Sequence, residues 1–358
     1  MKALVLAGGS GSRLRPFSHS APKQLLPIAN RPVLEYALEN LRAAGIHDVG
    51  VIVGDRGDQI RDALGDGSRL GLRLTYLRQD RPLGLAHCVR VARDFLAADD
   101  FVLYLGDVML LDGVGALVSD FGASRPAAQL AVHRVDDPRA FGVVELDAEG
   151  RVAALVEKPE EPRSDLVLSG AFAFTSAIHA AVDAITPSRR GELELTDAVQ
   201  WLVTGGAAVR VTRQPGFVAD TGRPEDVLAC HRRVLDALPV AAAPDGAVEA
   251  SELTGAVRIE PGARVTASRI TGPVVIGAGA RLHDCVVGPH VSVGGDCALT
   301  GAGITDSIVL DGASVSDVRG IRGSIIGRSV RIAGRADAAH RLLVGDHGHV
   351  DVGSGDAV

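Results

Sequence analysis

The chain has 358 residues and a formal net charge of -7, and 46% of its residues are hydrophobic while 3% are aromatic. This length exceeds what one hydrophobic core usually organises, so we expect two domains. The negative charge and scarce aromatic rings disfavour nucleic-acid binding, the four scattered cysteines predict neither a metal site nor disulfides, and no segment approaches the about 20 apolar residues of a membrane span. We therefore expect a cytoplasmic protein without nucleic-acid or membrane partners.

Residues 1–238 alternate between short apolar runs and amphipathic segments. The apolar runs predict strands at 2–6, 49–53, 72–77 and 101–105, and the segments between them predict helices at 32–44, 57–64 and 84–97. This alternation favours a Rossmann-like α/β fold, with a mainly parallel mixed sheet, flanking helices and right-handed crossovers. Ligands of such sheets bind beyond the carboxyl ends of the strands, so chemistry is expected there.

The periodicity changes after residue 238. Residues 239–250 break both patterns and predict a linker, and in residues 251–358 apolar residues recur six apart, with glycine and other small residues between them. Six is no multiple of the helical period, and a hexapeptide repeat is typical of a parallel β-helix in which three hexads form one triangular coil. A glycine-rich β-sandwich is the alternative. The repeating positions are Ile259 and Val265, then Ile270, Ile276 and Leu282, then Val287, Val293 and Leu299, with a short slip between series.

A glycine-rich segment, Gly8 to Arg13, follows the first predicted strand. Its glycines allow backbone N–H groups to face a phosphate without interference from Cβ atoms. A dinucleotide fingerprint would need a third glycine at Leu14, and a Walker A loop would need a Gly-Lys pair, which the chain lacks. Because Arg13, Arg15 and Lys23 follow closely, the segment suits a polyphosphate. A plain tight turn is the alternative.

Two carboxylates stand at candidate strand ends. Asp107 follows the buried run 101–105, and Asp220 lies in the segment VADTG. Mg²⁺ takes one or two carboxylates together with substrate phosphates and waters, so this pair could hold it. For either aspartate alone, a turn or a helix cap is the alternative.

A third group of charges surrounds the segment VEKP. Glu157 and Lys158 close a strand that follows FGVVE, and at a strand end both side chains can turn into one pocket, where a carboxylate accepts hydrogen bonds from hydroxyls and an ammonium meets a phosphate. Glu192 is a further hydroxyl acceptor or a charge at a helix start. The chain has 37 basic residues, of which only Lys2, Lys23 and Lys158 are lysines, so the last two attract attention. A surface charge pair is the alternative for Glu157 and Lys158.

Taken in order, these motifs resemble those of the sugar nucleotidylyltransferase family, and within it the long-form glucose-1-phosphate thymidylyltransferases. The resemblance covers nearly the whole chain. It rests on LAGGSGSRLRP at 6–16, PKQLLP at 22–27, LGDGSRLGL at 64–72, QDRPLGLAH at 79–87, LGD at 105–107, FGVVE at 141–145, VEKP at 156–159, RGELELTD at 190–197, DTG at 220–222 and the hexapeptide repeats.

The resemblance implies a Mg²⁺-dependent transfer of dTMP from dTTP to glucose 1-phosphate, a left-handed β-helix after the catalytic domain, and a homo-oligomer. It also assigns roles to residues, with Arg13, Lys23, Asp107, Lys158 and Asp220 as the catalytic set. The triphosphate is expected at Gly8, Gly9, Gly11, Ser12, Arg13 and Lys23, the base at Gln79 and Gly84, Mg²⁺ at Asp107 and Asp220, the sugar at Gly142, Glu157, Gly170 and Glu192, and the sugar phosphate at Lys158.

The sequence departs from the family pattern at two positions. Val108 stands where relatives usually have Asn, and Ala219 stands where a bulkier residue is common, so a contact to a substrate hydroxyl is missing. Three alternatives stay open: UTP or another sugar 1-phosphate as substrate, a sugar-phosphate-binding protein without catalysis, and an acyltransferase in the β-helix with His283 or His290 as its base.

Overall fold

The structure is a computed structural model that describes residues 1–240, 244–336 and 339–352. Residues 241–243, in the predicted linker, lie outside the described residues, as do 337–338 and 353–358 in the predicted β-helix. The chain forms two compact units. The first unit comprises Met1–Ser10 and Val33–Asp220, and the second comprises Gly11–Pro32 and Thr221–Val358.

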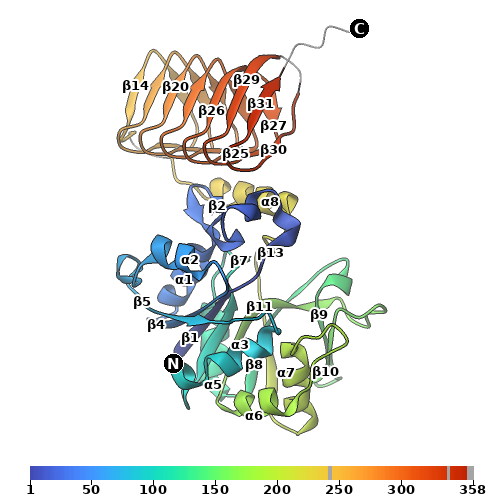
Figure 1. The fold of residues 1–358 in the computed structure, drawn as a ribbon. Helices are drawn as coiled ribbons and strands as arrows, with labels where there is room; N and C mark the ends of the chain where they lie inside the picture. The colour runs from blue at the N-terminus through green and yellow to red at the C-terminus, as the bar shows by residue number, and fades with distance from the viewer. Residues whose placement is uncertain (241–243, 337–338, 353–358) are drawn as a thin grey trace. The chain divides into compact units, whose positions relative to one another are not determined.

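The first unit is built on a nine-stranded mixed sheet (Figure 1). Its main path runs β10-β9-β11-β6-β1-β4-β5, while β8 pairs with β11 and β12. The strands β6, β1, β4 and β5 are parallel, and β11 pairs antiparallel with β6, β8 and β9. The strands are β1 (Lys2–Ala7), β4 (Asp48–Val53), β5 (Arg73–Arg78), β6 (Phe101–Leu105), β8 (Ala128–Arg134), β9 (Gly142–Leu146), β10 (Val152–Glu157), β11 (Leu166–Phe174) and β12 (Val209–Arg213).

Helices pack against this sheet, and a short β pair extends the unit. Helices α1 and α3 contact β1, α5 contacts β8, and α7 contacts β10. The pair joins β7 (Val108–Leu110) to β13 (Val218–Asp220). The helices are α1 (Val33–Ala43), α2 (Gly57–Leu64), α3 (Leu85–Val91), α4 (Arg93–Leu96), α5 (Gly115–Ser124), α6 (Ala177–Ala184) and α7 (Leu195–Thr204).

The expected α/β fold is therefore confirmed, and most expected elements begin and end within a residue of those observed. One helix differs: the predicted segment 84–97 is interrupted at Ala92, where α3 ends and α4 begins. The core explains the apolar runs, because β6 and its neighbours lie between helices and are buried on both faces. In β1 and β6, for example, Leu4, Val5, Leu103 and Tyr104 have no exposed surface.

The second unit contains three stacked parallel sheets (Figure 1). One has the order β14-β17-β20-β23-β26-β29-β31, another β15-β18-β21-β24-β27, and the third β16-β19-β22-β25-β28-β30. Their strands are β14 (Ala247–Glu249), β15 (Glu252–Thr254), β16 (Val257–Ile259), β17 (Arg264–Thr266), β18 (Arg269–Thr271), β19 (Val274–Ile276), β20 (Arg281–His283), β21 (Val286–Val287), β22 (Val291–Val293), β23 (Ala298–Thr300), β24 (Gly303–Thr305), β25 (Ser307–Val309), β26 (Ser314–Val318), β27 (Ile321–Arg322), β28 (Ile325–Ile326), β29 (Arg331–Ala336), β30 (Leu343–Val344) and β31 (His349–Val352).

These sheets confirm the β-helix, in agreement with the left-handed form that the family resemblance implies, and exclude the β-sandwich. Corresponding positions recur 17 residues apart in most coils, as in the hydrogen bonds from Ser268 N to Ser251 Oγ and from Cys285 N to Ser268 Oγ, and 16 or 18 apart in some later ones. Because 17 is one less than three hexads, a coil of this length shifts the apolar series by one residue, which explains the slip between the series. The series side chains point inward: Ile270, Ile276 and Val287 are fully buried.

Two further segments complete the second unit. Helix α8 (Pro224–Asp236) contributes Leu235, which packs with Ala29 and with Val275 of β19. The segment Gly11–Pro32, here called the basic loop because it carries Arg13 and Lys23, contains three short 3-10 helices, η1 (Ser12–Leu14), η2 (Phe17–His19) and η3 (Lys23–Leu25), and the strands β2 (Pro27–Ile28) and β3 (Arg31–Pro32). The β-helix, α8 and the basic loop therefore fold as one compact body.

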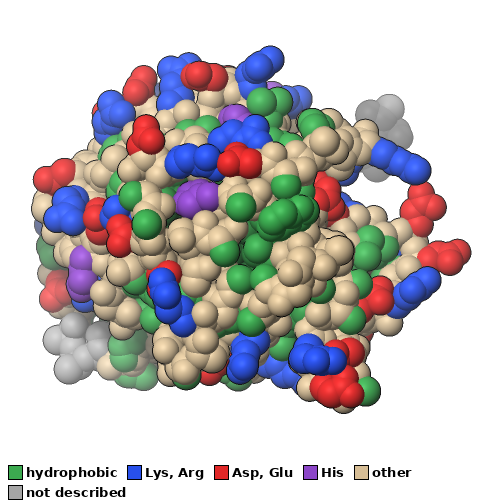
Figure 2. Space-filling model, turned by 90° about the horizontal axis from the view of Figure 1, so that it is seen from below, with side chains coloured by type: hydrophobic (Ala, Val, Ile, Leu, Met, Phe, Trp, Pro, Cys, Tyr) green, Lys and Arg blue, Asp and Glu red, His purple; other side chains and the backbone are tan. Residues whose placement is uncertain are grey.

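The surface carries acidic and basic side chains mixed together, as the face in Figure 2 illustrates. Many of the arginines pair with carboxylates; examples are Arg93 with Asp183 at 2.7 Å and Arg151 with Asp147 at 2.8 Å. Lys2 is also structural, because its Nζ lies 2.8 Å from Asp99 and donates to Phe95 O at 2.6 Å. Among the described residues, none of the helices is long and apolar enough to cross a membrane.

Candidate active site

The end of β1 and the end of β6 lie side by side in the first unit. Leu6 is paired with Leu105, and Gly106 N donates to Leu6 O at 2.9 Å. A Cβ at Gly106 would lie 3.0 Å from Leu6 O and 2.9 Å from Leu34 Cδ1, so glycine allows this close approach of the two strand ends without displacing either neighbour. Since the strands are parallel and in register, Gly8 and Asp107 both lie two residues beyond the paired residues Leu6 and Leu105. The first glycine expected to bind phosphate and the first candidate metal ligand therefore lie at the same end of the sheet.

The two candidate metal ligands lie at the same end of the pair formed by β7 and β13. Asp107 directly precedes β7, and Asp220, the last residue of β13, is paired with Val108, the first residue of β7. Both aspartates are partly buried. Two carboxylates at adjoining strand ends are a donor set that fits Mg²⁺, which fills its remaining positions with phosphate oxygens and waters. The described residues contain no group of three or more His, Cys, Asp or Glu side chains suited to a metal ion.

The candidate base-binding residues are locked together. The buried Gln79 amide donates from Nε2 to Gly84 O at 3.3 Å and lies 3.0 Å from His87 Nδ1. Its Oε1 faces Gly8, where a Cβ would lie 3.5 Å away. Gly84 has a φ of 104°, and a Cβ on it would lie 2.4 Å from Leu193 O. Only glycine fits this conformation and this close approach.

The same backbone contact connects the candidate base-binding residues to the candidate sugar-binding segment. Leu193 N donates to Leu83 O at 2.8 Å, and Ala86 N donates to Leu193 O at 3.0 Å. Glu192 directly precedes Leu193, so these two hydrogen bonds hold it beside Gly84. Residues that are more than 100 positions apart in the sequence thus form one short β-like contact in the first unit.

The candidate sugar-binding residues meet where β9 and β10 pair. Glu157, the last residue of β10, is opposite Gly142, the first of β9, and a Cβ on Gly142 would lie 3.3 Å from Glu157 Oε2. Lys158 adopts a φ of 43°, which turns the chain out of the strand, and its Nζ lies 3.3 Å from Glu157 Oε1. The two side chains therefore form an ion pair, and their turn into one substrate pocket stays a prediction. Thr196 Oγ1 donates to Glu157 Oε2 at 3.4 Å and fixes the carboxylate further.

Arg190 belongs to this cluster, although the sequence analysis assigned it no role. Its guanidinium lies 3.4 Å from Glu157, 3.4 Å from Glu192 and 3.5 Å from Glu194. Burial raises the pKa of Glu194, while a hydrogen bond from Ser188 and the charge of Arg190 oppose the shift. An arginine among three carboxylates keeps a cationic group beside Lys158. The sequence signal that could have identified Arg190 is its place in the segment RGELE, two residues before Glu192, an expected sugar ligand.

The side chain of Val108 packs against the backbone of Gly170. Gly170 has a φ of 79°, and a Cβ on it would lie 2.9 Å from Val108 Cγ2. Val108 is only 7% exposed, so its side chain packs on the Gly170 backbone. The side chain next to the first candidate metal ligand thus makes an apolar contact and offers no hydrogen-bonding group.

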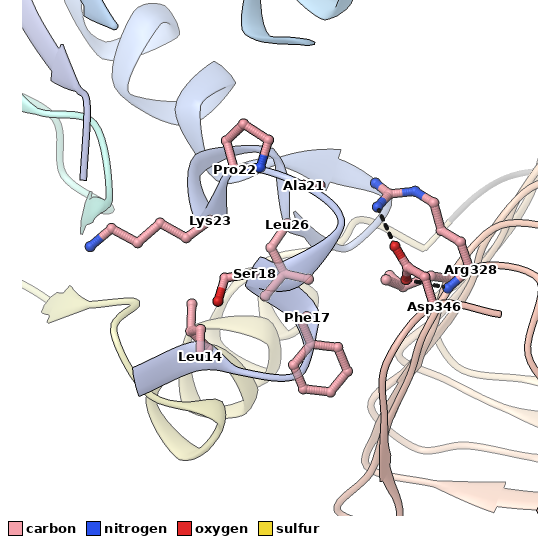
Figure 3. Close-up of a pocket in the computed structure, with 10 residues that line it drawn as sticks. Leu14, Phe17, Ser18, Ala21, Pro22, Lys23, Leu26, Arg328 and Asp346 are labelled. Carbon is pink, nitrogen blue, oxygen red and sulfur yellow. Dashed lines mark hydrogen bonds and ion pairs between the residues drawn. The ribbon is translucent and has the colours of Figure 1, made fainter. Parts of the chain in front are cut away.

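The remaining predicted residues, Gly11, Ser12, Arg13 and Lys23, belong to the basic loop of the second unit. Gly11 has a φ of 64°, and a Cβ on it would lie 3.0 Å from Lys23 Cβ. Ser12 and Arg13 are exposed in η1. Burial raises the pKa of Asp226 in α8, and the charge of Arg13 opposes this shift. Figure 3 shows Lys23 extending away from the β-helix. Gly9, in the first unit, is exposed.

An α/β sheet with glycines at one strand end, two aspartates at neighbouring ends and a cluster of acidic and basic side chains is typical of an enzyme that binds a nucleotide with Mg²⁺ and a second, hydroxyl-rich substrate. Residues 2–237 match the family described as nucleotidyl transferase. The chain belongs to this family.

Curated relatives match over almost the whole chain. A glucose-1-phosphate thymidylyltransferase of Streptomyces griseus is 52% identical over 357 residues, covering 99% of this chain and 100% of the relative. Another, of Streptomyces antibioticus, is 49% identical over 358 residues, with coverage of 99% and 100%. A crystal structure of a Bacillus anthracis protein in complex with a sucrose is 31% identical with a TM-score of 0.61, covering 64% of this chain and 94% of that one.

Proposed function

We propose that the protein is a glucose-1-phosphate thymidylyltransferase, which transfers dTMP from dTTP to glucose 1-phosphate and releases pyrophosphate. The observation that carries the proposal is the convergence of Gly8, Asp107 and Asp220 at adjoining strand ends. Near-complete matches to relatives with that activity support the choice of substrates. The product is an activated sugar nucleotide.

In the proposed reaction, a phosphate oxygen of the sugar 1-phosphate attacks the α-phosphorus of dTTP in line. A new P–O bond forms, the bond between the α-phosphorus and the bridging oxygen breaks, and pyrophosphate leaves with the electron pair. The attacking phosphate is already ionised, so no side chain has to act as a nucleophile or base. Because two anions must approach each other, the protein's contribution is positioning and neutralisation of charge.

The nucleotide side of the reaction is assigned to the strand-end residues and the basic loop. The glycines from Gly8 to Gly11 would offer backbone N–H groups to the triphosphate, and Arg13 and Lys23 would neutralise its charge. Asp107 and Asp220 would hold Mg²⁺, which supplies charge neutralisation at the phosphates when bound. Gln79 would read the base edge with an amide that Gly84 and His87 hold in place.

The sugar side is assigned to the cluster at the end of β10. Glu157 and Glu192 would accept hydrogen bonds from sugar hydroxyls, and Gly142 and Gly170 would give the ring room. Lys158 and Arg190 would meet the sugar phosphate, since both are cations next to Glu157. The ion pairs of the free protein would then be replaced by contacts to substrate.

A pyrophosphate-release panel tests the proposal. Purified protein with Mg²⁺ is mixed with dTTP, UTP or another nucleotide, and with glucose 1-phosphate, galactose 1-phosphate or an amino-sugar 1-phosphate. We expect the fastest release with dTTP and glucose 1-phosphate. A maximum with UTP or another sugar would move the assignment to that pair, and tight binding without any release would indicate a sugar-phosphate-binding protein. A homo-oligomer and a cytoplasmic location stay predictions.

The histidines considered for an acyltransferase have structural surroundings. His290 Nε2 lies 2.7 Å from Asp236 at the end of α8, and His283 Nδ1 lies 3.0 Å from Thr266 Oγ1 on the neighbouring coil. These contacts favour a role in packing the second unit, and transfer from acetyl-CoA that His290→Ala abolishes would be needed to restore the alternative.

A further inference from the structure

The basic loop is fastened to the β-helix at several points of the second unit. Asn30 Nδ2 donates to Val293 O in β22 at 2.8 Å. Pro16 lies so close to Gly345 that a Cβ on the glycine would be 2.9 Å from Pro16 Cβ. Ser20 Oγ donates to Asp346 Oδ2 at 2.5 Å. The loop that carries Arg13 and Lys23 therefore depends on coils far away in the sequence.

Asp346 lies at the centre of this contact. Its side chain is only 6% exposed, and its second oxygen, Oδ1, accepts from Arg328 N at 2.7 Å. The Arg328 guanidinium lies 3.7 Å from Oδ2. A mostly buried carboxylate held by a backbone N–H and by an arginine is a fixed acceptor, and hydrogen bonds to such charged acceptors are among the stronger ones in proteins.

Within the basic loop, further contacts connect the segment around Ser20 to Gly11 and Lys23, which are proposed to bind the triphosphate. Two positions before Ser20, Ser18 is buried, and its Oγ donates to Gly11 O at 2.6 Å. Gly11 in turn packs on Lys23. Loop residues such as Leu14, Phe17 and Leu26 line a small pocket together with Leu310, Arg328 and Asp346 (Figure 3). A shift of the segment 16–20 would therefore be felt at Gly11 and Lys23.

Asp311 caps a turn of the β-helix in the way that Asp346 does, but its hydrogen bond and ion pair lie within the β-helix. Asp311 Oδ1 accepts from Gly295 N at 2.8 Å, as Asp346 does from Arg328 N two coils further on. Its side chain is 61% exposed and lies 4.0 Å from Arg328, a distance at which an exposed ion pair contributes little. Capping a turn of the β-helix is thus common to both aspartates, and the contact to the basic loop belongs to Asp346.

We propose that Asp346 is a positioning residue for the nucleotide-binding loop, which makes the last coils of the β-helix part of the machinery for nucleotide binding. The proposal rests on the proposed function, because it concerns the same triphosphate.

The test compares Asp346→Ala with Asp311→Ala. We expect Asp346→Ala to raise the KM for dTTP on the order of tenfold, because misplacement of a positioned group weakens binding and turnover, and to leave the KM for glucose 1-phosphate unchanged. Asp311→Ala should leave both values unchanged. Asp346→Asn should recover most of the loss, since its Oδ1 can accept from Arg328 N and its amide can donate to Ser20 Oγ.

A second measurement does not require turnover. Hydrogen exchange followed by mass spectrometry should show faster exchange of residues 12–26 in Asp346→Ala and in Ser20→Ala, and unchanged exchange in Asp311→Ala. If wild-type protein releases no pyrophosphate, the proposed function fails. The hydrogen-exchange comparison would still show whether Asp346 holds the basic loop in place. If Asp346→Ala does not fold, Ser20→Ala gives the same comparison with the turn cap intact. Wild-type exchange and dTTP affinity in Ser20→Ala would overturn the proposal.

Discussion

The sheet of the first unit and the β-helix of the second are both built from short, apolar, largely parallel strands, yet they place functional groups differently. In the sheet, each strand ends in a different loop, and register alone brings Gly8 next to Asp107. In the β-helix, a position meets its equivalent one coil later, 17 residues on in most coils, so one side chain type performs one structural task repeatedly. A ligand needs several different groups at one place. The strand ends of the sheet lead into loops of different sequence and can place such different groups together. A regular repeat places them together only where the repeat is interrupted.

The strongest test of this contrast is Asp107→Asn at a strand end of the sheet. Loss of one ligand for the metal and its charge should lower kcat on the order of 10² to 10³, while the thermal midpoint stays within a few degrees of wild type. Steady-state pyrophosphate release measures the effect. Asp55→Asn is the matched control, because Asp55 is 89% exposed and lies 3.9 Å from Arg78; it should behave as wild type. Equal activity of the two variants would contradict the assignment of Asp107.

A smaller effect, on stability as well as activity, is expected for Gly84→Ala. The new Cβ would lie 2.4 Å from Leu193 O at a φ of 104°, and the backbone contact between the base and sugar segments would have to open. We expect a loss in unfolding free energy on the order of 3 kcal/mol, measured by urea denaturation. Gly45→Ala is the control: Gly45 has a φ of 79° with open space around it, so about 1 to 2 kcal/mol of backbone strain is expected. Identical losses would show that strain, and not the Leu193 contact, matters.

The smallest effect, and one confined to stability, is expected inside the β-helix. Ser268 Oγ accepts from Cys285 N at 2.9 Å, and Ser307 Oγ accepts from Ser324 N at 3.1 Å. Ser268→Ala and Ser307→Ala each leave a buried N–H without its acceptor, at a cost of about 1 to 2 kcal/mol in unfolding free energy. Both kcat and KM should stay at wild-type values. A loss of activity in folded Ser268→Ala would contradict the expectation that these β-helix positions affect stability alone.

Most of the fold could be predicted from the sequence, because it depends on local periodicity. The strand over 101–105 and the helix over 57–64 were predicted with the observed bounds, since apolar runs and helical spacing report burial directly. The six-residue spacing likewise predicted the β-helix. The break at Ala92 was missed because its neighbours keep a helical composition, while Leu85–Val91 and Arg93–Leu96 form separate helices.

The site was predictable in its parts and less so in its assembly. The motifs located Glu157, Lys158 and the aspartates, but no periodicity reports that Leu193 pairs with the backbone around Gly84, or that Arg190 lies among three carboxylates. Such contacts join loops of unrelated sequence. The grouping of the basic loop with α8 and the β-helix has the same origin, since single hydrogen bonds such as that from Asn30 to Val293 leave no pattern in the sequence. The predicted division into residues 1–238, 239–250 and 251–358 stays a prediction.

The hydrogen bond between Ser20 and Asp346 also sets an order of events during synthesis, because its partners are 326 residues apart. At about 5 to 20 residues per second, the ribosome reaches Asp346 on the order of tens of seconds after Ser20. The sheet can be complete long before then, since its strands lie between Lys2 and Arg213. A nascent chain interrupted before Asp346 would therefore carry a finished sheet and a basic loop held by α8 and β22 but without the hydrogen bond at Ser20, which only translation of the later coil supplies.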